Sequence, residues 1–240
     1  MNQLKTLAIV LKSEPIGETD RIYTFYTEKY GKISLIAQST RKIQAKLSGH
    51  LEKPNLVEIV FSTTFKNRLI TALAKESFLN IKSKIKPLKA AFFITELVDE
   101  FTLLNQKDSN LWELLLNSLY FLEENVKKLE EVSDFITFYF NAQLLNILGV
   151  SPFLDGCVIC GSQINIHFFS FEEKGLVCLK HKKNSDFRID SKKIRILKAL
   201  FNLPLEKFKK PMVILEILKE KKFLEQFFEQ FTFKIKSVIM

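Results

Sequence analysis

The chain has 240 residues, 47% of them hydrophobic, so it can bury a substantial core and is not expected to be disordered. It contains only seven glycines, so glycine-rich loops that cradle phosphates are not expected. The net charge of +9 and the isoelectric point near 9.3 favour polyanionic partners, although a lysine-rich surface can also serve solubility alone.

The start of the chain predicts neither a secretion signal nor a membrane anchor. The apolar stretch 7–11 is followed at once by Lys12 and Glu14, which is too short for a signal-peptide core. No segment approaches the roughly 18 uncharged apolar residues that a membrane span needs. Three cysteines, an odd number, argue against a disulfide framework. We therefore expect a soluble, cytoplasmic protein with no membrane contact.

Residues 1–80 predict a small antiparallel barrel. Five segments are rich in β-branched and aromatic residues, several of them alternating with period two, and turn residues separate them. The predicted strands are 7–11, 21–27, 32–38, 56–62 and 69–75. A five-stranded OB-fold fits this strand count, and such folds often bind single-stranded nucleic acid. The count alone also permits an SH3-like barrel or a plain sandwich.

A basic segment within this region is a candidate DNA-binding surface. From Lys29 to Leu51 the sequence has no acidic residue, and it includes a predicted loop after the third strand. Such a loop can follow a phosphate backbone. The aromatic residues of 23–30 could stack bases, but we expect most of them to fill the barrel core. The candidate DNA-binding residues are Lys29, Lys32, Arg41, Lys42 and Lys46.

From about residue 88 the apolar residues recur every three or four positions, which predicts helices over 88–104, 110–126 and 132–149. Gly149 is a plausible stop for the third helix. Helical spacing resumes over 191–201 and 212–233. The predicted organisation is α+β, with an OB-fold domain (1–80), a helical domain in two parts (81–150 and 188–240) and a zinc-ribbon insert (151–187).

Two pairs of metal-ligand residues lie in the insert, with the spacing C-x2-C-x17-C-x2-H. Zinc takes four nitrogen or sulfur ligands in a tetrahedron, and two tight pairs on separate turns supply them. We predict that Cys157, Cys160, Cys178 and His181 bind one zinc ion. Buried free thiols or chance spacing are the alternative, and His167 could replace His181, although its position fits a strand residue better.

The predicted zinc is structural, and the protein is not expected to be an enzyme. Four protein ligands close the coordination shell, whereas a catalytic zinc keeps a position open for water. No H-x-E or H-E-x-x-H element lies near the two cysteine pairs. The zinc would instead stabilise an insert that is too short to have a core of its own.

The positive charge is concentrated in the two end regions, with twelve basic against seven acidic residues in 1–80 and sixteen against seven in 180–240. The second region begins with a basic run that could bind phosphates or an acidic peptide tail. A solvated helix face is an equally good interpretation. This run consists of Lys180, Lys182, Lys183, Arg188, Lys192, Lys193, Arg195 and Lys198.

Four features together resemble the bacterial recombination mediator family RecO. They are VLKSEPIGETDRIYTFYTEKYGKIS near the start, the basic loop with LSGHLEKPN, the segment FNAQLLNILGVSP, and the cysteine pairs that follow. The elements G-E-x-D-R-I and E-x-x-G-K are weak singly, but their order before L-L-x-x-L-G-x-x-P-x4-C-x-x-C is fairly specific. The resemblance covers most of the chain up to about His181.

The resemblance implies an N-terminal OB-fold, a helical domain with a zinc-ribbon insert, and no catalysis. It implies a nucleoid-associated DNA repair and recombination protein that binds single- and double-stranded DNA and anneals strands coated with single-strand-binding protein. With RecR, such a protein helps to load RecA, and its helical domain binds the acidic, apolar C-terminal tail of the single-strand-binding protein. Many relatives have Cys at the position of His181, and both residue types bind zinc.

Two other functions remain open at this point. A zinc-dependent hydrolase would need an open metal position and a cluster of carboxylates. An RNA-binding or transcription-associated zinc-ribbon protein would share the barrel and the zinc site, and only a 2′-hydroxyl-dependent site would separate it from a DNA-binding protein. The concentration of charge in two regions favours DNA annealing, because two phosphate-binding surfaces would reduce the repulsion between complementary strands.

Overall fold

The computed structural model describes residues 3–38, 49–63 and 67–239, with the backbone alone from 233 onward. The chain forms two compact units, Met1–Ser133 and Asp134–Met240. The finer division into four segments stays a prediction. No helix in the described part of the chain is long and apolar enough to span a membrane.

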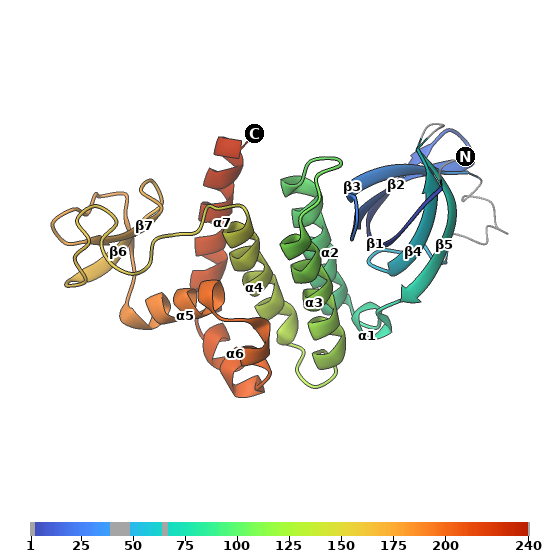
Figure 1. Cartoon of the computed structure of the whole chain (residues 1–240). Coiled ribbons are helices and arrows are strands. Elements are labelled where there is room, and N and C mark those ends of the chain that lie inside the picture. The colour runs from blue at the N-terminus through green and yellow to red at the C-terminus, as the bar shows by residue number, and fades with distance from the viewer. Residues whose placement is uncertain (1–2, 39–48, 64–66, 240) are drawn as a thin grey trace. The chain divides into compact units, whose positions relative to one another are not determined.

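The first unit begins with the predicted OB-like barrel (Figure 1). Its strand order is β1-β2-β3-β5-β4, closed by pairing of β4 with β1, and β3 runs parallel to β5 where Ile36 meets Arg68. Neighbouring strands otherwise pair antiparallel, which is the arrangement of a five-stranded Greek-key barrel. The strands are β1 (Gln3–Ile16), β2 (Asp20–Thr27), β3 (Gly31–Ala37), β4 (Leu56–Ser62) and β5 (Arg68–Glu76).

β1 is longer than its predicted core of 7–11 because its two halves have different partners. Residues 3–9 pair with β4, and residues 8–16 pair with β2. A register shift between Val10 and Lys12 marks the change. A bulge of this kind bends a strand and lets it serve two neighbours in a closed sheet.

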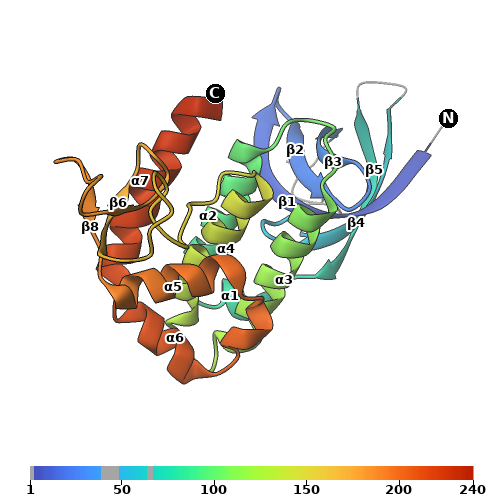
Figure 2. The ribbon, with the colours of Figure 1, turned by 60° about the vertical axis from the view of Figure 1, so that its left-hand side comes forward.

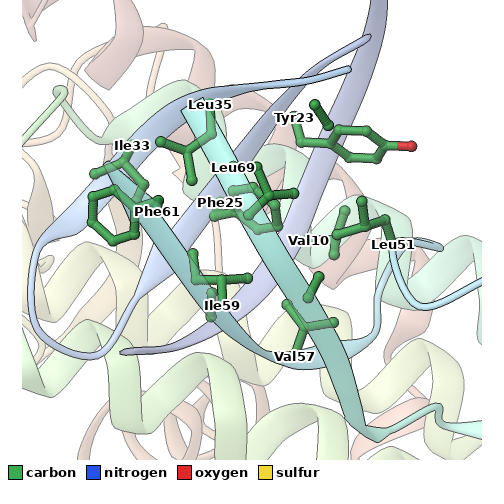
Figure 3. Packing of buried hydrophobic residues seen from close by; sticks show 13 residues of the cluster. Val10, Tyr23, Phe25, Ile33, Leu35, Leu51, Val57, Ile59, Phe61 and Leu69 are labelled. Carbon is green, nitrogen blue, oxygen red and sulfur yellow. The ribbon is translucent and has the colours of Figure 1, made fainter. Parts of the chain in front are cut away.

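The barrel interior is filled by one aliphatic and aromatic cluster, whose side chains point toward one another in Figure 3. Alternate residues of β3 are buried, as period two requires. The aromatic residues of β2 lie inside the fold, since Tyr23, Phe25 and Tyr26 are at most 4% exposed. They are therefore core residues and not base-stacking platforms. Tyr30 is partly buried and packs edge-on against Phe61.

Three helices complete the first unit, namely α1 (Leu79–Lys82), α2 (Ile85–Phe101) and α3 (Ser109–Asn125). Both long helices were predicted, and Asp108 caps α3 by accepting the N–H of Leu111 at 3.0 Å. The four-residue α1 was not predicted. The Glu123 carboxylate of α3 holds it by accepting the N–H groups of Asn80 and Ile81 at 2.9 Å.

The turn between β2 and β3 is covered by the α2–α3 loop. Gly31 has φ of +66°, and a Cβ there would lie 1.9 Å from the carbonyl oxygen of Gln106. Asn105 donates its N–H to the carbonyl of Lys32 at 2.8 Å, and Leu104 forms a bridge with Lys32. Only glycine satisfies both the backbone conformation and this close approach.

The second unit contains α4 (Val132–Ile147), α5 (Ser191–Asn202), the 3-10 helix η1 (Leu205–Phe208), α6 (Pro211–Leu218) and α7 (Lys221–Ile239) (Figure 2). The predicted stop of α4 at Gly149 is confirmed. Gly149 has φ of +70°, its N–H bonds the carbonyl of Asn146, and the N–H of Val150 bonds that of Leu145. This is the Schellman pattern of a helix end.

The predicted helical segment 212–233 is two helices. The chain turns at Lys219–Glu220, and the N–H of Leu224 then bonds the Glu220 carbonyl to start α7. α7 carries an aromatic stripe of Phe223, Phe227 and Phe231, four residues apart on one helix face. All three side chains are buried.

The segment between α4 and α5 forms a three-stranded sheet of order β7-β6-β8, with β6 (Ile166–Ser170), β7 (Gly175–Cys178) and β8 (Phe187–Arg188). This sheet is not an isolated insert. The ring of Phe169 lies 4.9 Å from that of Phe227 and 6.0 Å from that of Phe231, centroid to centroid. Phe171 also packs on Phe227, at 5.7 Å. The sheet thus shares a core with α7.

Candidate metal centre and basic surfaces

The predicted metal ligands lie on two tight turns. In the first turn, the N–H of Gly161 bonds the Cys157 carbonyl, and the N–H of Cys157 bonds the Ser162 carbonyl, both at 2.8 Å. Gly161 has φ of +72°, which glycine adopts without strain. In the second turn, which follows β7, the N–H of His181 bonds the Cys178 carbonyl at 3.0 Å. Each turn presents two ligand atoms.

The structure brings the four ligand atoms together, all within 4.8 Å of one another. His181 Nδ1 lies 3.3 Å from Cys178 Sγ and 3.7 Å from Cys157 Sγ, and Cys160 Sγ lies 4.0 Å from Cys178 Sγ. A tetrahedral zinc with ordinary bond lengths separates two sulfurs by about 3.8 Å and a sulfur from a nitrogen by about 3.6 Å. The cluster therefore has the dimensions of a site that can hold one metal ion.

The electrostatics of the cluster favour the thiolate form of two of the three cysteines. Burial opposes ionisation of Cys157, but N–H donors of Cys178, Cys160 and Ile159 together with His181 outweigh it and lower the pKa of Cys157 to about 6. The pKa of Cys178 is also lowered, because donors including the Lys180 N–H outweigh burial. The Ser162 N–H lowers the pKa of Cys160, but burial and the hydrogen bonds to Cys157 and Cys178 outweigh it and raise that pKa. Hydrogen bonds to Cys157 and Cys178 raise the pKa of His181. A cation between the sulfurs would replace the proton on His181.

His167, the alternative ligand, is not in the cluster. It lies on β6 as expected, is exposed, and its carbonyl accepts the N–H of Ile189 at 2.9 Å. No carboxylate belongs to the cluster, and Asp155 is 2.8 Å from the ammonium of Lys198. In residues 3–38, 49–63 and 67–232, this is the one group of His, Cys, Asp or Glu with metal-site dimensions.

The candidate DNA-binding lysines of the barrel differ in availability. Lys29 is exposed in the β2–β3 turn. Lys32 is only 12% exposed, and its ammonium donates to the carbonyl of Asp99 at 2.6 Å and lies 3.3 Å from its carboxylate. Lys12 binds the other carboxylate oxygen at 2.9 Å. Lys32 therefore holds β3 to α2 and is not presented to a ligand.

Arg41, Lys42 and Lys46 lie outside the described residues. Two further cations flank the point where the chain leaves β3 toward them. Arg21 pairs in register with Ala37, the last residue of β3, and Arg68 pairs with Ile36. Arg68 is exposed, and Arg21 donates to Ser13 at 3.0 Å. The sequence analysis missed both because cross-strand register, and not proximity in sequence, places them there.

Half of the C-terminal basic run is engaged in ion pairs. Lys183 binds Glu172 and Glu173 at 2.9 and 3.0 Å, and the other pairs are Lys192–Glu220 (3.0 Å), Lys193–Asp190 (3.2 Å) and Lys198–Asp155 (2.8 Å). Lys182 lies 4.9 Å from the centre of the Phe168 ring. Within the described residues, Lys180, Arg188 and Arg195 have no ion pair.

A groove of about 510 Å³ lies between α5, η1 and α6. Its wall is apolar, and Met212 at one side is 79% exposed. The cations Arg195 and Lys207 border it, together with Lys192 and Glu216. The sequence analysis did not predict this groove, because it requires α6 to break from α7. The apolar lining residues are Ile196, Ala199, Leu203, Phe208, Met212, Val213 and Ile217.

Comparison with known proteins matches both parts of the chain to one family. Residues 1–77 match the family model "Recombination protein O N terminal", and residues 83–234 match "Recombination protein O C terminal". The "DNA repair protein RecO" of Thermoanaerobacter sp. (strain X514) is 32% identical over 185 residues, covering 76% of this chain and 72% of the relative. That of Caldanaerobacter subterraneus subsp. tengcongensis is 30% identical over 213 residues, covering 88% and 83%.

Proposed function

Because the chain belongs to the recombination protein O family, we propose that it is a DNA repair protein that binds single- and double-stranded DNA and anneals complementary strands. Its substrate is single-stranded DNA coated by single-strand-binding protein, and with RecR it helps to load RecA. It makes and breaks no covalent bond. The observation that carries the proposal is the family match over both 1–77 and 83–234, with an OB-like barrel in the first part.

On the barrel, the proposed DNA-binding residues are Lys29, Arg41, Lys42 and Lys46, with the addition of Arg21 and Arg68, which pair with the last residues of β3. Lys32 is withdrawn from this set because Asp99 binds it. Cations on one face neutralise phosphates and release counterions, which supplies most of the affinity for a nucleic acid backbone. Tyr23, Phe25 and Tyr26 are buried, so contacts to the DNA backbone, rather than stacking of bases on these rings, are proposed to supply the affinity of the barrel.

The metal in this proposal is one structural Zn²⁺ held by Cys157, Cys160, Cys178 and His181. Three sulfurs and one imidazole nitrogen suit zinc, and four protein ligands leave no position for a reacting water. When bound, the ion supplies cross-linking and no chemistry. The two turns and β7 position the ligands, and the shared core with α7 supports that framework.

The groove between α5 and α6 is the proposed seat of the acidic C-terminal tail of single-strand-binding protein. An apolar wall bordered by Arg195 and Lys207 complements a peptide that combines apolar and acidic residues. Arg195→Glu should weaken binding of a synthetic tail peptide at least tenfold. Lys222→Glu, an exposed lysine on α7, makes the same charge change outside the groove. Equal affinities of both variants would count against this site.

Strand annealing is the direct test of the function. Two complementary oligonucleotides, one carrying a donor dye and the other an acceptor, are coated with single-strand-binding protein and mixed with the zinc-loaded chain. We expect a rate well above that of the coated strands alone, reduced by Arg68→Glu and Lys29→Glu together. Absence of any acceleration, with or without single-strand-binding protein, would contradict the proposal.

A further inference from the structure

Both metal-binding turns expose an aliphatic side chain. Ile159, between Cys157 and Cys160, is 48% exposed, and Leu179, between Cys178 and His181, is 58% exposed. Because the ligand atoms on the two turns lie within 4.8 Å of one another, these side chains flank a single site. We call Ile159, Leu179, Lys180 and Lys182 the ribbon tip. Its two apolar residues are about half exposed and belong to neither the buried core nor the residues packed around Cys157, so core packing alone does not explain them.

The ribbon tip is more positive than the sequence suggests. Residues 151–179 contain one basic and three acidic residues. In the structure, Glu172 and Glu173 bind Lys183, and Asp155 binds Lys198. Asp186 accepts the N–H of Lys183 at 2.6 Å. Lys180 and Lys182 are exposed and, among the described residues, have no carboxylate partner. The ribbon tip therefore presents two cations beside two aliphatic side chains.

The ribbon tip is held in place from behind. The Val158 N–H bonds the Leu176 carbonyl of β7 at 2.8 Å, and Val158, Ile166 and Phe168 pack around the buried Cys157 and Val177. The Phe168 ring also lies under the ammonium of Lys182. A metal ion would further cross-link the two turns. Preorganisation of this kind reduces the ordering cost of binding.

We propose that the ribbon tip binds double-stranded DNA, with Lys180 and Lys182 on the phosphates and with Ile159 and Leu179 against the bases of the minor groove. This inference rests on the proposed function and adds a surface for the product of annealing. Aliphatic side chains flanked by cations are the means by which many proteins wedge into the minor groove and unstack base steps.

Two other occupants fit less well. Single strands are generally bound by stacking on exposed aromatic rings, and the ribbon tip exposes none. An apolar peptide residue is bound in a concave pocket, whereas the two aliphatic side chains of the ribbon tip are about half exposed on two turns. The chain's groove for such a ligand is the one between α5 and α6. Duplex DNA, which itself supplies the groove, matches both the charge and the projecting aliphatic groups.

The test uses the full zinc-loaded chain and a dye-labelled 20-base-pair duplex in an anisotropy titration over a series of salt concentrations. Lys180→Ala with Lys182→Ala should weaken duplex binding about tenfold at 0.1 M salt and lower the slope of log K against log salt by about two. Single-strand affinity should change less than twofold. Lys127→Ala with Lys128→Ala, an exposed pair in the α3–α4 loop, makes the same change in net charge and should leave duplex affinity unchanged.

A separate fluorescence measurement tests the role of Ile159 and Leu179. In a duplex that contains 2-aminopurine, the wild-type chain should raise the fluorescence by unstacking a base, and Ile159→Ser with Leu179→Ser should abolish that rise. Zinc content and circular dichroism establish that each variant is folded. Wild-type duplex affinity and salt slope in the lysine variant would overturn the inference, as would equal losses for single strands and duplex. A wild-type chain that binds and anneals no DNA would instead overturn the proposed function.

Discussion

Phe169→Ala is expected to uncouple the sheet that carries the candidate metal centre from α7. The Phe169 side chain is fully buried, with ring centroids 4.9 Å from Phe227, 5.1 Å from Phe171 and 6.0 Å from Phe231. Truncating a buried Phe to Ala typically costs about 3–5 kcal/mol. At about 1.4 kcal/mol for each tenfold change, the equilibrium for opening of this core should shift by a factor on the order of 10² to 10³ or more.

Metal release should report that opening. Residue 169 pairs with Leu176, two residues before the ligand Cys178, so an opened sheet no longer holds both turns together. We expect faster transfer of zinc from the variant to a chromogenic chelator, and faster hydrogen exchange in β6, β7 and α7. The sole tryptophan, Trp112, is buried in α3 of the first unit, so its fluorescence should not change.

Phe153→Ala is the matched control, because that side chain is 44% exposed and the same atoms are deleted. It should leave zinc release nearly unchanged. A loss of less than about 1 kcal/mol for Phe169→Ala, with wild-type zinc transfer, would show that the sheet and α7 do not share a core in solution. A change in Trp112 fluorescence would show that the two units unfold together.

Three further outcomes are expected. Gly31→Ala should destabilise the first unit by more than about 2 kcal/mol in urea unfolding followed by Trp112 fluorescence, because its Cβ would overlap the Gln106 carbonyl, and a smaller cost would mean that the α2–α3 loop relaxes freely. Cys178→Ser should lose stoichiometric zinc by metal analysis while its barrel stays folded, and retained zinc would refute the assigned ligand set. Asp190→Ala should cost about 1 kcal/mol. Hydrogen bonds from Lys193 to the Asp190 carboxylate lower the pKa of Asp190. This stabilisation is therefore present above the unfolded pKa of 3.8 and is lost as the pH falls through the lower folded pKa. A difference in unfolding free energy between wild type and variant that does not change with pH would contradict this prediction.

The features that depend on local pattern could be predicted from the sequence. The content of β-branched and aromatic residues, with period-two alternation in several segments, placed all five barrel strands. The spacing of Cys157, Cys160, Cys178 and His181 selected the four residues that the structure brings together. Gly149 marked a helix end because its positive φ is a local requirement. For the strands and for Gly149 the signal lies within a few residues of the feature, and for the metal ligands it lies in two short pairs separated by seventeen residues.

The features that depend on distant contacts could not be predicted from the sequence. Lys32 looked like a DNA-binding residue until Asp99, far along the chain on α2, was seen to bind it. Arg21 and Arg68 joined the candidate surface only through strand register. The groove required the break at Lys219–Glu220, which no proline or glycine marks in the sequence. Tertiary packing decides which residues on different helices and strands contact one another, and the short-range periodicity of the sequence does not predict those contacts.

The cover over the β2–β3 turn has a consequence for self-association. Among the residues that the structure describes, β3 pairs with β5 only where Ile36 meets Arg68, so much of the described outer edge of β3 has no neighbouring strand within the barrel. Leu104 and Asn105 occupy that edge at Lys32, as a strand from another molecule otherwise could. An uncovered edge is a template for strand addition and aggregation. The α2–α3 loop thus protects this edge of the barrel from pairing with a strand of another copy of the chain.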